Sequence, residues 1–119
     1  MQNNWHCLEN LKADAEGNIR ARAVVPADSP WFSGHFPGNP ILPAIAQLAI
    51  VFDMIQESTG RKQDPGAVKR VKYRRIIRPG EAIHVAATPV DGKAGTFSFQ
   101  MSVDGEMACK GRISTDSIK

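Results

Sequence analysis

The sequence has little cysteine. Its 119 residues include only Cys7 and Cys109, which lie almost the whole chain apart. This separation offers neither the close spacing of a zinc site nor a disulfide framework. We therefore expect free thiols in a reducing, cytoplasmic setting, and neither a metal nor another cofactor.

Long hydrophobic runs are also missing. The first ten residues, MQNNWHCLEN, lack the basic start and apolar run of a secretory signal. No apolar stretch approaches the roughly 20 residues that a membrane helix needs. Internal repeats, low-complexity tracts and linkers are absent as well. These absences predict one soluble domain, residues 1–119, without a membrane span.

Acidic residues are scarce in one segment. Residues 61–78 contain eight Lys and Arg residues and one acid, Asp64, whereas the rest of the chain has 7 basic and 11 acidic residues. Alternation over residues 69–75 predicts a strand with one basic face, made of Arg70, Lys72 and Arg74. A solvated strand face and a docking surface for an anionic partner are both open interpretations. Few aromatic residues stand among these charges, which argues against nucleic acid.

The hydrophobic pattern predicts an α+β domain. Strands are expected over residues 5–12 and 18–25, before a loop rich in Pro and Gly over 28–43 that excludes regular structure. Residues 44–58 lack Gly and Pro and predict a buried helix that ends at Gly60. Four further strands, over 68–77, 82–88, 95–103 and 106–114, predict an antiparallel meander. This order gives one sheet wrapped on a single helix.

The loop before the helix contains His35 and offers two catalytic parts. An imidazole exchanges a proton near neutral pH, so His35 suits a general base held in a stiff loop. The unsatisfied amides at the helix start, near Ala44, suit a carbonyl oxygen that becomes an enolate. Together they fit proton abstraction next to a thioester carbonyl. The alternative is a loop histidine that only hydrogen-bonds a backbone carbonyl.

Residues 34–40, GHFPGNP, together with Pro43 resemble the GHFPGxPxxPG signature of the hot-dog-fold 3-hydroxyacyl-acyl carrier protein dehydratases. Residues 40–48, PILPAIAQL, look like the PILPGVAQL form of the aryl-polyene-type dehydratase-like proteins. Residues 73–81 are similar to the family's strand that ends in a Pro-Gly-Asp/Glu turn. The resemblance implies the hot-dog fold, a curved antiparallel sheet around one central apolar helix. It also implies dehydration of (3R)-3-hydroxyacyl thioesters in fatty-acid or related lipid and polyene biosynthesis.

The resemblance also assigns residues. His35 would be the base that takes the C2 proton, and the amide of Ala44, where the family has Gly, would hold the thioester oxygen. Phe36 and Gly38 are further candidates for substrate binding.

The resemblance implies an acid fourteen positions after the histidine, contributed by the partner's helix, which protonates the departing 3-hydroxyl; this chain has Ala49 there. Asp53, one turn later on the same helix face, is a candidate replacement. The alternative assigns Asp53 to the polar surface of the helix. Gln47 is interpreted as a satisfied core or interface amide.

The implied partners are an acyl carrier protein or a coenzyme A thioester, docked on Arg70, Lys72 and Arg74. Two subunits would share the active sites, as a homodimer, a higher oligomer of dimers or a heteromer with a homologue. Ala49 leaves two other functions open: a non-catalytic acyl-binding or structural subunit, and an acyl thioesterase. His6 and His84 are expected to be structural or surface residues.

Overall fold

The computed structural model describes residues 5–32, 41–60 and 63–117, so His35, Phe36 and Gly38 lie outside the described residues. The elements are β1 (Cys7–Ala13), β2 (Ile19–Val24), the 3-10 turn η1 (Pro30–Phe32), α1 (Ala44–Thr59), β3 (Gln63–Tyr73), β4 (Ala82–Pro89), β5 (Thr96–Val103) and β6 (Glu106–Ser117). The predicted helix and strands are confirmed. The expectation of no regular structure in the proline-rich loop is wrong at η1, where Phe32 N–H donates to the Ser29 carbonyl.

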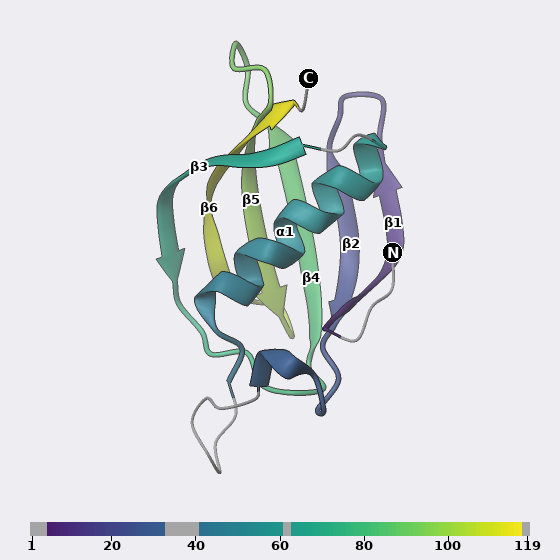
Figure 1. Ribbon diagram of the computed structural model, residues 1–119, viewed down its shortest axis with the longest axis vertical. Coiled ribbons are helices and arrows are strands. Elements are labelled where there is room, and N and C mark those ends of the chain that lie inside the picture. The colour runs from purple at the N-terminus through teal and green to yellow at the C-terminus, as the bar shows by residue number, and fades with distance from the viewer. Residues whose placement is uncertain (1–4, 33–40, 61–62, 118–119) are drawn as a thin grey trace.

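The strands form one antiparallel sheet in the order β1-β2-β4-β5-β6-β3 (Figure 1). Strands β4, β5 and β6 form the expected meander. The strand before them does not join it beside β4, because β3 pairs with β6, placing Val68 opposite Ile113 and Tyr73 opposite Cys109. From the end of β3 the chain therefore crosses below the sheet to reach β4. That crossing segment, residues 74–81, borders the candidate site.

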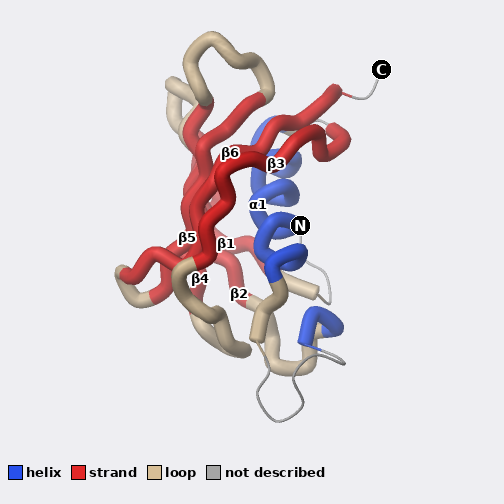
Figure 2. Tube along the Cα trace, turned by 90° about the vertical axis from the view of Figure 1, so that its left-hand side faces the viewer, coloured by secondary structure: helices blue, strands red, loops and turns tan. Residues whose placement is uncertain are grey.

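Helix α1 lies along one face of the curved sheet, which we call the inner face (Figure 2). Its inward side chains are fully buried against the inward side chains of the strands; they are Ala46, Ile50, Val51, Met54 and Ile55. Complete burial of one such aliphatic side chain stabilises the fold by about 1.5–3 kcal/mol. The helix ends as predicted at Gly60, whose φ of 69° is left-handed. No helix among the described residues is long and apolar enough to cross a membrane.

Strand β3 contains a bulge at Arg70. Lys69 lies opposite Arg112 and Lys72 opposite Lys110, so β3 has one residue more than β6 between these pairs. Arg70 has a φ of 56°, in the left-handed region that non-glycine residues seldom adopt. Because of the extra residue, the valine that follows Arg70 packs against the core while the lysines on either side of the bulge face outward.

Candidate active site

Helix α1 begins at Ala44 without a side-chain cap, since Pro43 occupies the cap position. The amides of Ala46 and Gln47 donate to the Pro43 carbonyl, at 3.1 and 3.2 Å. Among the described residues, no acceptor is bonded to the amides of Ala44 and Ile45. The helix start predicted at Ala44 is confirmed, and it leaves N–H donors of the first turn available, as helix starts do.

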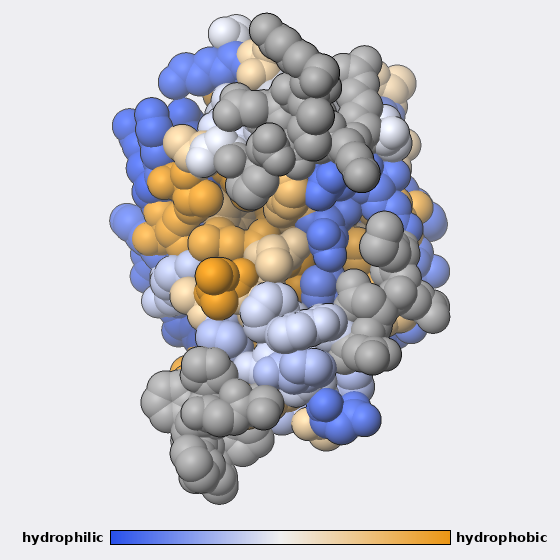
Figure 3. Space-filling view, viewed as in Figure 1, coloured by the Kyte–Doolittle hydropathy of each residue, from blue (hydrophilic) through white to orange (hydrophobic). Residues whose placement is uncertain are grey.

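A hollow of about 530 Å³ lies beside this helix start. One wall comes from the segment before the helix and the first turn of α1, including Ile41, Ala44 and Gln47. The other wall comes from the end of β3 and the crossing segment, including Tyr73 and Ile76. Figure 3 shows hydrophobic surface between the first half of α1 and β3. Exposed Ile45, Tyr73 and Ile76 mark the same part of the molecule as suited to an apolar ligand or a second subunit.

Gln47 is buried on the first turn of α1, with 4% of its surface exposed. Its Nε2 donates to the Leu42 carbonyl at 3.3 Å. Its Oε1 is buried and has no hydrogen-bond partner among the described residues. Leaving such an acceptor unsatisfied costs about 1–3 kcal/mol. The interpretation of Gln47 as a satisfied core amide holds for its nitrogen but not for its oxygen within this chain, and its interpretation as an interface amide stays a prediction.

Asp53 does not stand alone on the helix surface. Its Oδ2 lies 2.7 Å from Nε2 of His6, a buried residue just before β1. The Trp31 indole N–H faces His6 Nδ1 at 3.4 Å. Because an indole nitrogen only donates, this pattern assigns the His6 proton to Nε2, which donates it to Asp53. The structural role expected of His6 is thus supported, but its link to Asp53 spans 47 residues and has no signature in the sequence.

The remaining sequence candidates, Ala49 and His84, and the aromatic residues of η1 lie in different places. Ala49 is partly exposed on the outer side of α1, one turn before Asp53. Phe32 belongs to the core, while Trp31 is only partly buried and meets Trp5 edge to face at 4.7 Å. His84 is exposed on β4. Among the described residues, no cluster of His, Cys, Asp or Glu could hold a metal ion.

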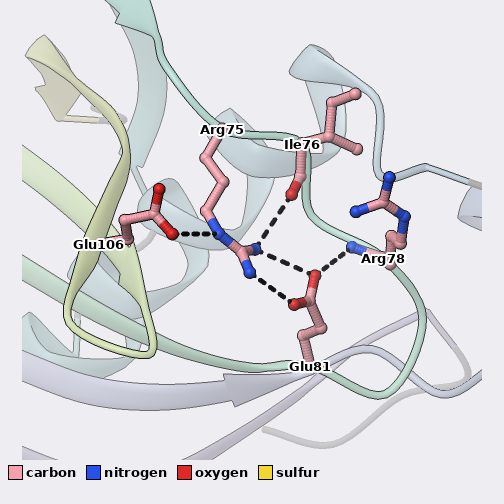
Figure 4. Close-up of polar contacts among 5 residues, drawn as sticks. All are labelled: Arg75, Ile76, Arg78, Glu81 and Glu106. Atoms are coloured by element: carbon pink, nitrogen blue, oxygen red, sulfur yellow. Dashed lines mark hydrogen bonds and ion pairs between the residues drawn. The ribbon is translucent and has the colours of Figure 1, made fainter.

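The crossing segment is fixed by Arg75 (Figure 4). Its guanidinium donates to both carboxylate oxygens of Glu81, at 3.2 and 3.0 Å, and to Glu106 at 3.2 Å. It also donates to the Ile76 carbonyl at 3.1 Å, so the clamp reaches the wall of the hollow. The hydrogen bonds to Glu81 raise the pKa of Arg75, and the same bonds lower the pKa of Glu81. The sequence predicted the turn before Glu81 but not this clamp.

The predicted basic face of Arg70, Lys72 and Arg74 is split between the two sides of the sheet. Arg74 lies after β3 and lines the hollow at the helix start. Arg70 faces the other side of the sheet, where it lines a hollow of about 410 Å³ with Lys110 and Arg112. The expectation of one face for Arg70, Lys72 and Arg74 is wrong because the bulge at Arg70 interrupts the alternation and β3 ends at Tyr73.

The outward cations of β3 and β6 form a group that we call the outer basic cluster: Lys69, Arg70, Lys72, Lys110 and Arg112. Two of its pairs, Lys69 with Arg112 and Lys72 with Lys110, are like charges directly opposite one another. Such pairs are destabilising. No described carboxylate forms an ion pair with any member of the cluster. The cluster is therefore uncompensated positive charge that suits an anionic partner.

Comparisons with known proteins agree with this architecture. The profile of the family described as ApeI-like, ApeI dehydratase, matches residues 11–112. The 3-hydroxyacyl-[acyl-carrier-protein] dehydratase FabZ of Latilactobacillus sakei is 35% identical over 102 residues, covering 78% of this chain and 73% of that protein. FabZ of Rickettsia felis is 30% identical over 115 residues, covering 87% and 78%.

Solved structures share the fold. The dehydratase heterocomplex ApeI:P from Xenorhabdus doucetiae has a TM-score of 0.80 at 23% identity, covering 92% of this chain and 96% of that one. A hypothetical thioesterase with coenzyme A from Streptococcus pneumoniae has a TM-score of 0.64 at 10% identity, covering 94% and 87%. The hot-dog fold expected from the sequence is confirmed. With its profile match over most of its length and its FabZ relatives, the chain belongs to the ApeI-like dehydratase family.

Proposed function

We propose that this protein dehydrates (3R)-3-hydroxyacyl thioesters to trans-2-enoyl thioesters in fatty-acid or related lipid and polyene biosynthesis. The observation that carries the proposal is the apolar hollow beside the first-turn amides of α1, which have no acceptor among the described residues, in a chain of a dehydratase family. An acyl chain fits the apolar wall, and an N–H at Ala44 suits a thioester oxygen that gains negative charge. Phe36 and Gly38, in the segment before the helix, are proposed to contact the substrate.

In the proposed reaction His35 takes a proton from C2, and the electron pair of that C–H bond forms the C2–C3 double bond. The C3–O bond breaks, and the departing oxygen takes a proton and leaves as water. General acids and bases each contribute typically about 10²–10⁴-fold in rate. Ala49 has no proton to give. We therefore assign the acid to Asp53 of the partner subunit, because Asp53 does not line the hollow of its own chain. Its carboxyl group is held by His6 and remains partly exposed.

The test is a spectrophotometric assay of 3-hydroxyacyl and trans-2-enoyl thioesters of an acyl carrier protein. His35→Ala should abolish turnover, and Asp53→Asn should reduce it by about 10²-fold or more. Asp91→Asn, in an exposed turn, is the matched control and should leave the rate unchanged. An unchanged rate in His35→Ala would remove the base assignment, and an unchanged rate in Asp53→Asn would remove the acid. Release of free thiol instead of water would point to a thioesterase.

A second function is a non-catalytic acyl-binding subunit of a heteromer. Ala49 favours it, and a structural neighbour is described as the heterocomplex ApeI:P. This alternative predicts thioester binding without turnover by the isolated protein. Under it, Ala49→Glu should create activity, whereas in the Asp53-dependent enzyme the same change adds at most a second acid. Co-purification with a homologous subunit would support the heteromer, and an active dimer of this chain alone would argue against the non-catalytic role.

We propose that an acyl carrier protein docks on the basic side chains that flank the sheet edge at β3. Arg70 and Lys72 belong to the outer basic cluster, and Arg74 stands at the hollow, so the three would contact the carrier on both sides of this edge. Charge reversal at Lys72, to Glu, should raise KM for the carrier-bound substrate but not for a short pantetheine thioester. Equal effects on both substrates would contradict carrier docking. The free thiols of Cys7 and Cys109 fit the cytoplasm as the site of this reaction.

A further inference from the structure

We propose that Gln47 is a positioning residue whose Oε1 accepts a hydrogen bond from the 3-hydroxyl group of the acyl thioester. The inference rests on the proposed function, because its ligand is the proposed substrate. Gln47 lines the hollow at the start of α1, is 4% exposed, and leaves Oε1 without a partner among the described residues. A buried acceptor without a hydrogen-bond donor is energetically unfavourable. A site that contains one favours a ligand that supplies the donor over a ligand that lacks it.

A half-turn of the Gln47 carboxamide would not give its oxygen a hydrogen-bond donor. Its Nε2 donates to the Leu42 carbonyl at 3.3 Å, so the flipped amide would bring two acceptors together. Leu42 is itself held, because its N–H donates to the Ile77 carbonyl at 2.7 Å. The bond joins the segment before the helix to the crossing segment on the opposite wall of the hollow. The position of Oε1 is thus fixed before a ligand binds, and Oε1 can accept a hydrogen bond from an O–H or N–H group of that ligand.

The 3-hydroxyl is the donor that the site fits best. Ala44 and Gln47 are three residues apart, so they lie on neighbouring positions of one side of the first helical turns. A thioester oxygen at the Ala44 amide leaves the third carbon of the acyl chain only two bonds beyond the carbonyl carbon. Its hydroxyl can then reach Gln47 while the remaining carbons follow the apolar wall at Ile41 and Ile76.

A carboxamide oxygen accepts a hydrogen bond but has no proton to transfer. Gln47 therefore fixes the orientation of the C3–O bond, and the proton for the departing oxygen comes from another group. The enoyl product and a saturated acyl chain both lack the hydroxyl. The site should thus prefer the 3-hydroxyacyl form in binding, independently of turnover.

The test is calorimetric binding of two pantetheine amides, in which nitrogen replaces the thioester sulfur so that elimination does not proceed. One bears a (3R)-3-hydroxyoctanoyl chain and the other the octanoyl chain. The wild-type protein should bind the hydroxy compound about tenfold more tightly, the value of one good hydrogen bond. In Gln47→Leu the preference should disappear, with octanoyl affinity kept within about twofold. Gln100→Leu, on the outer face of the sheet, is the matched control and should keep the preference.

Each other result has a definite meaning. Equal binding of the two compounds by the wild-type protein, or a preference that survives in Gln47→Leu, overturns the role of Gln47 alone. Failure of the wild-type protein to bind either compound overturns the proposed function beneath it. Thermal unfolding measures the structural role of Gln47 separately, because Gln47→Leu removes the hydrogen bond to the Leu42 carbonyl along with the unsatisfied oxygen. A lower melting temperature with the hydroxy preference intact would assign Gln47 a structural role only. Gln47→Met provides a second variant of similar length if the leucine variant does not fold.

Discussion

His6 and Asp53 join the start of the chain to the middle of its only described α-helix. Their side chains meet at 2.7 Å across 47 residues, and the contact holds α1 against the segment that enters β1. His6 is 3% exposed and Asp53 37%, so the bond lies at the boundary of the core. A single interaction of this kind couples the position of a helix residue to an edge strand.

We expect His6 and Asp53 to be energetically coupled. His6→Ala should lower the free energy of unfolding by about 1–3 kcal/mol, because it leaves a buried gap and removes a hydrogen bond to a carboxylate. A double-mutant cycle with Asp53→Ala should give a coupling energy of about 0.5–3 kcal/mol in urea unfolding. The exposed pair Arg22 and Glu9, 3.9 Å apart, is the control and should give a value near zero. Additive effects of His6→Ala and Asp53→Ala would contradict the coupling.

The clamp at Arg75 should make stability depend on pH. The pKa of Glu81 is lowered in the folded state, chiefly by its hydrogen bonds from Arg75, from an ordinary value of 4.5. Its contribution is therefore present above pH 4.5 and is lost as the pH falls through the lowered value. Glu81→Gln should lose about 1 kcal/mol at neutral pH, and the difference from wild type should shrink in more acidic buffer. Urea titrations at several pH values measure this.

Glu106→Gln is the control for the clamp. Its side chain is 72% exposed and makes one hydrogen bond to Arg75, so its loss should matter less than that of Glu81. A larger loss of stability in Glu106→Gln than in Glu81→Gln would show that the clamp is centred on the β5–β6 turn instead.

The thiol of Cys109 should be unreactive in the folded protein. Cys109 is fully buried, and burial raises its pKa to about 11. Iodoacetamide should therefore label the partly exposed Cys7 first and reach Cys109 only after unfolding. The unfolded chain ionises this thiol from about pH 9, so stability should fall as the pH rises from 9 toward 11. Cys109→Val should weaken that fall, and equal labelling of both thiols would contradict the assignment.

The bulge at Arg70 should lower the stability of the fold while its side chain strengthens the binding of the carrier. A non-glycine residue in the left-handed region costs about 1–2 kcal/mol. Arg70→Gly should therefore raise the free energy of unfolding by up to about 1 kcal/mol while weakening the affinity for an acyl carrier protein. Lys69→Gly, at the neighbouring position, removes the same kind of charge and should lower stability instead. If both variants are destabilised alike, the left-handed backbone at Arg70 carries no strain.

Most of the fold follows from local sequence signals. The helix from Ala44 to its cap at Gly60, and the strands that alternate inward and outward, are visible in hydrophobic period and turn residues. The position of β3 is not, because pairing with β6 is a long-range choice that no local pattern specifies. The bulge could have been read from VKRVKY, in which the valines are three residues apart, whereas a regular strand repeats every two.

The candidate site divides in the same way. The start of α1 at Ala44 follows from the prolines before it and from the helix pattern. The partner of Asp53, the unpaired oxygen of Gln47 and the contact of Arg75 with Glu106 depend on which distant segments meet. Hydrogen bonds between side chains far apart in sequence leave no periodic trace, so these features required the structure.

Arg75 joins three parts of the molecule through one guanidinium: the turn before β4, the first residue of β6 beside the β5–β6 turn, and the backbone at Ile76. The wall of the hollow is thus linked to a surface residue, Glu106, that does not line the hollow. Selection for a different acyl chain could act on residues of the β5–β6 turn, and a directed-evolution experiment should recover chain-length variants there as well as in the lining itself.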